Sequence, residues 1–293
     1  MRACIRALKF SAVLLAALGC APAYAAWDFV PTGLEWQSWP EYCRVQYSWV
    51  NAGFEYQYGG TVPGDIVESW KHHIGDETFM GMHHWCASMH FLNRARAEPD
   101  PKLHDFELSR ASEDAMFSFL RADPLSPVYP NMVVTVAQIR DAMRKPDEAQ
   151  EVLERGIKAQ PQRAEPYVML ALLNRERHKL PEARDVLKKA DDVTRGESAE
   201  IQYNLGLINL ELGDTAAAHA NARTAYGRGY PLPGLKNKLL RAGKWSAADD
   251  SAVEADIAAM RATQTGAAAP QAAPPQAAPA PASTASLPVA SQQ

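Results

Sequence analysis

The sequence predicts an all-α protein in which helical hairpins stack as a solenoid, preceded by an N-terminal helical cap and followed by a disordered C-terminal tail. Segments repeat along the chain, so that Val136-Ala137, Leu170-Ala171 and Leu205-Gly206 align at spacings of 34 and 35 residues. Apolar residues recur at helical spacing within each segment, and small residues recur where two helices must approach closely. One hairpin cannot bury its own apolar face, so neighbouring hairpins must stack.

Residues 1–25 are expected to be a secretory signal peptide. Arg2, Arg6 and Lys9 form a basic start, an apolar run follows, and Ala23-Tyr24-Ala25 supplies the small residues that flank a cleavage site. An alternative is lipoprotein processing with a lipid anchor at Cys20. Both interpretations predict export, to the periplasm as a secreted protein or, in the alternative, to the outer membrane as a lipoprotein.

Charge and cysteine content narrow the classes of partner and the compartment. The full chain has a formal net charge of −4, and loss of the basic signal segment would make it more negative, which argues against a nucleic-acid partner. No run after the signal segment is long and apolar enough to span a membrane. Cys43 and Cys86 are the two cysteines left after cleavage, and in an oxidising compartment they are expected to form a disulfide.

Residues 26–75 are expected to form an aromatic-rich N-terminal cap. A helix is predicted to begin at Trp39-Pro40-Glu41 and to carry Cys43, since proline is tolerated in a first turn. The favoured interpretation is that the aromatic rings pack this cap against the first repeat. The alternative is that they stack on sugars in a glycan-handling accessory protein. The block's tryptophans are Trp27, Trp36, Trp39, Trp49 and Trp70.

Residues 76–125 are predicted to be a degenerate first repeat with a loop insertion. Helices are expected over 76–97 and 105–122, because Pro99 and Pro101 forbid a continuous helix between them. In this frame Cys86-Ala87 takes the place of Leu170-Ala171 in the later repeat.

Residues 130–232 contain three units that resemble the tetratricopeptide repeat family. The closest correspondence is the segment with Tyr203-Asn204-Leu205-Gly206, then Leu212-Gly213-Asp214, then Ala218 and Ala225. Residues 130–163 and 164–198 also match, although Arg195 stands where a proline is usual. The resemblance implies a right-handed superhelix whose first helices line a concave surface that binds extended peptides or partner proteins, and it does not imply an enzyme.

The C-terminal part is expected to close the stack. Residues 233–262 are predicted to form capping helices, the second opened by a capping box of Ser246 and Asp249. Residues 263–293 consist mainly of alanine, proline and polar residues and include no charged residue, which predicts a disordered tail.

The stretch GMHHWCASMH at residues 81–90 allows three interpretations. The favoured one is structural, with Cys86 bonded to Cys43 and with His83 and His90 packed in the core. The second is a metal or cofactor site in which His83, Cys86 and His90 share a helix face, a ligand set that suits copper or zinc. The third is a catalytic cysteine–histidine pair, which a cysteine at a packing position makes a poor candidate.

The leading functional hypothesis is a non-enzymatic adaptor or scaffold of a cell-envelope system, with protein partners and no cofactor. It would bind a partner segment in the concave groove that the family resemblance implies. The residues expected to line that groove are His84, Phe91, Gln138, Val168, Arg175, Tyr203 and Glu211.

Overall fold

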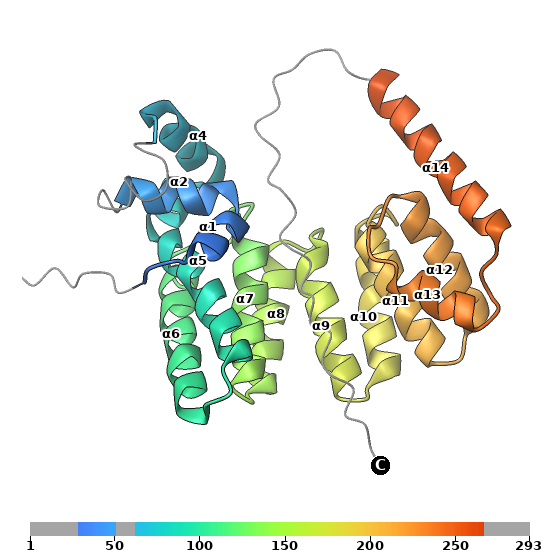
Figure 1. Ribbon diagram of the computed structural model, residues 1–293, viewed down its shortest axis with the longest axis horizontal. Coiled ribbons are helices and arrows are strands. Elements are labelled where there is room, and N and C mark those ends of the chain that lie inside the picture. The colour runs from blue at the N-terminus through green and yellow to red at the C-terminus, as the bar shows by residue number, and fades with distance from the viewer. Residues whose placement is uncertain (1–28, 51–61, 267–293) are drawn as a thin grey trace, which may run out of the picture. The chain divides into compact units, whose positions relative to one another are not determined.

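The computed structural model of the chain describes residues 29–50 and 62–266, and its regular elements there are all helices (Figure 1). Those two ranges contain no β-strand, which confirms the predicted all-α class. Residues from Pro31 onward belong to one unit and those up to Val30 to another. The predicted signal segment and its Cys20 lie outside the described residues. The helices are α1 Gly33–Ser38, α2 Glu41–Val50, α4 Gly64–Ile74, α5 Asp76–Ala97, α6 Pro101–Phe119, α7 Tyr129–Ala142, α8 Pro146–Ala159, α9 Ala164–Glu176, α10 Leu180–Val193, α11 Ala199–Glu211, α12 Thr215–Gly227, α13 Gly234–Arg241 and α14 Ala247–Gly266.

Helices α2 and α4 pack on α5 through aromatic side chains. Trp39, Tyr42, Tyr47 and Trp70 are buried, and the Tyr42 ring lies 6.0 Å from that of Trp85 on α5 in a stacked orientation. Burial of these rings supports the interpretation that the block is a packed cap, because a ring that is covered by its own chain cannot stack on a sugar. Trp27 lies outside the described residues.

The predicted loop insertion between the first two repeat helices is wrong, because α5 and α6 follow each other closely. The helix over 76–97 is confirmed, but α6 begins at Pro101 rather than at 105, so that only residues 98–100 separate the two helices. The Asp100 carboxylate accepts hydrogen bonds from the backbone N–H groups of Lys102 and Leu103. Pro101 then occupies the first turn, where its missing N–H costs nothing. Residues 101–104, which were expected in the loop, therefore form the first turn of α6.

Helices α7 to α12 form three hairpins, α7–α8, α9–α10 and α11–α12. Each second helix also packs on the first helix of the next hairpin, and α9 packs on both α7 and α11. The turns inside the hairpins share one feature. Arg144, His178 and Gly213 all have positive φ, of 60°, 60° and 84°, the left-handed conformation that commonly ends a helix.

Small residues let the paired helices approach closely. A Cβ added at Gly156 on α8 would lie 2.6 Å from Val133 Cγ1 on α7, which leaves no room for a larger residue. Ala183 and Ala190 on α10 are likewise fully buried. These are the small positions that the repeat alignment identified.

The described part of the chain closes with two helices, α13 and α14, in the region where capping helices were predicted. Leu235, Leu239 and Trp245 are buried with residues of α11 and α12. The predicted capping box is present, since the Ser246 N–H donates to Asp249 Oδ2 at 2.9 Å and the Asp249 N–H donates to Ser246 Oγ at 3.4 Å. Helix α14 continues to Gly266, so the predicted tail is helical over 263–266 and lies outside the described residues from 267 onward. Within the described part of the chain, no helix has both the length and the apolar character that a membrane span requires.

Candidate functional site

The predicted disulfide between Cys43 and Cys86 is confirmed, and it joins α2 to α5. Both residues are fully buried. The Trp39 indole Nε1–H donates to the Cys86 carbonyl at 2.9 Å, which ties the chain just before α2 to the same turn of α5. Helices α5 and α6 also pack together as a hairpin, which we call the first hairpin, and the disulfide belongs to the contact between it and the N-terminal cap.

Two histidines of the 81–90 stretch lie at that contact. The Gln46 side-chain amide lies 2.9 Å from His83 Nδ1, and the buried His90 ring lies 5.1 Å from the Trp39 ring. Burial lowers the pKa of His83 to about 4, helped by the charge of His84, and burial lowers the pKa of His90 to about 4 as well. Both rings are therefore neutral at pH 7.

The disulfide removes the sulfur ligand from the metal site considered at His83, Cys86 and His90. The Cys86 sulfur is bonded to Cys43 and cannot serve as a thiolate. Within residues 29–50 and 62–266, no three His, Cys, Asp or Glu side chains lie close enough to share a metal ion. The same bond removes the nucleophile that a cysteine–histidine pair would need.

His84, predicted to face a partner, instead pairs with the second helix of its own hairpin. Its Nδ1 lies 2.7 Å from Asp114 Oδ1 on α6, and its ring centroid lies 4.2 Å from that of Phe117. His84 and Phe117 line a hollow of about 700 Å³ between α5 and α6. We call this the α5–α6 hollow, and its other lining residues are Asp76, Glu77, Met80, Gly81, His83, Leu120 and Arg121.

Two of the predicted groove residues, Phe91 and Val168, are covered by neighbouring side chains of the same protein. Val168 is buried in the core between α9, α10 and α11. Phe91 is buried beneath the guanidinium groups of Arg94 and Arg110, whose carbons lie 5.8 and 5.5 Å from its ring centre. Such residues contribute packing and are unavailable to a partner.

Tyr203 is covered by the C-terminal cap. Its ring stacks on that of Tyr230 at a centroid distance of 4.3 Å, and a Cβ added at Gly234 would lie 2.6 Å from its hydroxyl oxygen. Burial raises the pKa of the Tyr203 hydroxyl. The segment that follows α12 thus closes over the position that the repeat pattern places on the partner side.

The remaining predicted residues stay partly accessible on three adjacent helices. Gln138 on α7 is half-buried, and Arg175 on α9 and Glu211 on α11 are paired with each other, with Arg175 Nε 2.8 Å from Glu211 Oε2. Hydrogen bonding to Glu211 raises the pKa of Arg175. Partly exposed leucines lie at neighbouring positions on the same side of α9 and α11. We call this set the α7–α9–α11 face, made of Gln138, Leu172, Arg175, Leu207, Leu210 and Glu211.

Charges of both signs continue across this region. Arg96 near the end of α5 interacts electrostatically with Asp141 on α7 and with Glu176 on α9. Burial raises the pKa of Asp141 and of Glu176, which opposes the effect of the neighbouring arginines. The helix ends thus present alternating basic and acidic groups beside the leucines, which is a mixed surface rather than a purely apolar one.

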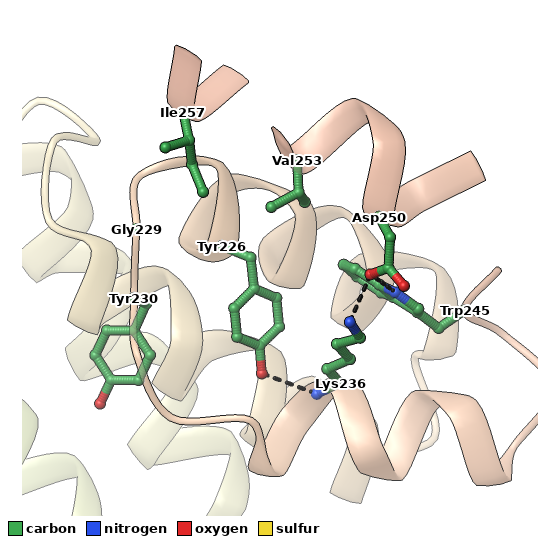
Figure 2. Close-up of a pocket in the computed structure, with 8 residues that line it drawn as sticks. All are labelled: Tyr226, Gly229, Tyr230, Lys236, Trp245, Asp250, Val253 and Ile257. Atoms are coloured by element: carbon green, nitrogen blue, oxygen red, sulfur yellow. Dashed lines mark hydrogen bonds and ion pairs between the residues drawn. The ribbon is translucent and has the colours of Figure 1, made fainter. Parts of the chain in front are cut away.

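A second hollow, of about 200 Å³, lies between α12, α13 and α14 (Figure 2). Its polar groups pair with one another: Tyr226 Oη accepts from the Lys236 N–H at 2.9 Å, and Lys236 Nζ lies 2.6 Å from Asp250 Oδ1. The Trp245 indole N–H also donates to Asp250, at 2.9 Å. Burial raises the pKa of Tyr226 to about 12. These contacts hold α13 and α14 to α12, so the residues around this hollow have a structural role.

Two features of the surface were missed at the level of sequence. Asp114, the partner of His84, was not singled out, because its register on α6 depends on where that helix begins. The large exposed side chains of α6 were also missed, although their spacing was visible in the sequence.

No protein-family model matches the chain, and no curated protein matches it.

Proposed function

We propose that the protein is a non-enzymatic adaptor of the tetratricopeptide type that binds a partner segment across the α7–α9–α11 face. The succession of hairpins supports this proposal, since each first helix packs on the first helix of the next hairpin. Small residues at the predicted contacts, such as Gly156 against Val133, support it as well. Neighbouring first helices in that arrangement form a continuous surface on which an extended segment can lie.

The observation that carries the proposal is that equivalent positions of three adjacent helices remain partly exposed while the positions between them are buried. Leu172 and Leu207 offer apolar surface, whereas Arg175 and Glu211 offer charges at its edge. Apolar contacts would supply most of the binding free energy, and the charges would select the partner and its register. Val168 supports this surface from the core between α9, α10 and α11.

The compartment we propose is the cell envelope, with the periplasm preferred to a lipid anchor at Cys20. A buried disulfide that joins two helices is typical of proteins that fold in an oxidising compartment. The partner is therefore proposed to be another envelope protein.

A charge exchange tests the proposed surface without removing its internal ion pair. In the variant Arg175→Glu with Glu211→Arg the two side chains still attract each other, but the charges presented to a partner are reversed. We expect normal thermal stability and loss of the partner when the tagged protein is purified from envelope extracts. The matched control is Lys188→Glu on the exposed side of α10, which should keep the partner. Equal recovery of the partner with both variants would contradict the proposed surface.

A further inference from the structure

Helix α6 exposes large apolar side chains along one side, whose C-terminal end borders α5 at the α5–α6 hollow. Leu103, Phe106, Phe117 and Leu120 are 53%, 59%, 38% and 62% exposed. Their spacing alternates between three and four residues once Arg110 and Glu113 are included, which places all six on one side of the helix. The opposite side is buried against the hairpin core and carries Leu108, Ala111 and Ala115. We call this set, in which Arg110 alone is half-buried, the α6 stripe: Leu103, Phe106, Arg110, Glu113, Phe117 and Leu120.

The α6 stripe is complementary to itself when it is reversed. If a second α6 runs antiparallel about a twofold axis at residues 111–112, then Leu103 lies opposite Leu120 of the second copy and Phe106 lies opposite Phe117. The two charged positions also match, because Arg110 lies opposite Glu113. All six positions thus find a partner of the same or opposite character, and each contact occurs twice, as a twofold interface requires.

We propose that the α6 stripe is a homodimer interface in which two copies of this chain pack with their α6 helices antiparallel. The alternation of three and four residues is the heptad seam of helix pairs that interlock side by side. A parallel pairing would instead place Arg110 against Arg110 and Glu113 against Glu113, which is unfavourable. The apolar residues of the stripe read the same in both directions, and its two charges are opposite. A second copy of α6 needs this symmetry, whereas a different partner would not.

The α5–α6 hollow completes the fit. Phe117 and Leu120 line it together with Met80, which is itself 48% exposed. In the antiparallel arrangement Leu103 and Phe106 of the second copy lie against this end of the helix, where the hollow offers room for their side chains. The stripe runs over 18 residues, from Leu103 to Leu120, a rise of about 25 Å along the helix. Contact along one helix of this length suits a reversible dimer rather than an obligate one.

The charged pair gives the sharpest test, measured by sedimentation velocity of the purified exported protein from micromolar to submillimolar concentration. We expect a concentration-dependent monomer–dimer equilibrium for the natural chain. Glu113→Arg and Arg110→Glu should each weaken dimerisation by roughly tenfold or more, because each places like charges opposite each other. The double variant exchanges the two charges and should regain the dimer, which a mere loss of folding could not produce.

Two further measurements make the proposal specific to α6. Phe106→Asp should abolish the dimer, whereas Leu125→Asp, at a residue that is 75% exposed but outside the stripe, should leave it intact. An equal mixture of Leu103→Cys and Leu120→Cys proteins should form a disulfide-linked dimer that neither protein forms alone. A natural chain that stays monomeric at all concentrations, a double variant that does not recover, or cross-linking of the Leu103→Cys protein with itself would each overturn the proposal.

Discussion

The disulfide between Cys43 and Cys86 is expected to hold the N-terminal cap on the first hairpin, and the variant Cys43→Ala with Cys86→Ala tests this. The two cysteines are 43 positions apart. In the chain-entropy treatment, closure of a loop of that length stabilises the folded state by about 4 kcal/mol. Alanine is the suitable replacement because both positions are fully buried and a hydroxyl there would lack water.

Removal of the disulfide should destabilise the N-terminal cap and leave the stability of the later hairpins unchanged. Hairpins in a stack contact mainly their neighbours, so weakening of the contact between α2, α4 and α5 leaves α9 to α12 untouched. A loss of about 4 kcal/mol corresponds to roughly 1,000-fold faster hydrogen exchange in amides that open with the cap. We therefore expect amides of α2 and α4 to exchange much faster in the double variant, with those of α10 unchanged. Cap amides that exchange within about tenfold of the natural rate would refute this reasoning.

Three further outcomes follow from individual contacts. Gly156→Leu should destabilise the α7–α8 hairpin by about 1–3 kcal/mol, because its side chain would collide with Val133, and urea unfolding of Gly156→Leu with and without Val133→Ala would measure the relief. Burial tends to raise the pKa of Glu35, but hydrogen bonds from Arg94 and from the Thr32 N–H lower it to about 2, below its ordinary 4.5, so this carboxylate stabilises the fold above pH 4.5 and less as the pH falls toward 2. Consequently the stability difference between the natural chain and Arg94→Leu should shrink over that pH range, and a difference independent of pH would contradict the assignment. Ser246→Ala should cost about 1 kcal/mol in α14, seen as faster amide exchange confined to that helix.

Local signals in the sequence predicted the parts of the structure that depend on near neighbours. The bounds of α5 and the capping box at Ser246 follow from helical spacing and from a cap residue three positions before its partner. The disulfide followed from compartment and cysteine count. The start of α6 was wrong because Pro101 was taken as a helix breaker, whereas after the capping residue Asp100 it opens the helix.

The candidate site was harder to predict from the sequence, because the exposure of each side chain depends on segments far away in the chain. The repeat pattern places Tyr203 on the partner side, but nothing within its own repeat shows that Tyr230 and Gly234 return to cover it. The positive φ values of Arg144 and His178 were likewise hidden, since neither residue type is typical of that conformation, whereas Gly213 at the equivalent turn is. Register within a helix can be inferred locally, but which face a later segment covers cannot.

The most direct test of the proposed function is site-specific photo-cross-linking in cells that export the protein. A photoreactive amino acid would be placed at Gln138 or Leu207 on the α7–α9–α11 face, and at Lys189 on the exposed side of α10 as the control. We expect one shared cross-linked partner from both positions on the face and none from Lys189. Cross-links from Lys189 alone, or an identical set of products from all three positions, would contradict it.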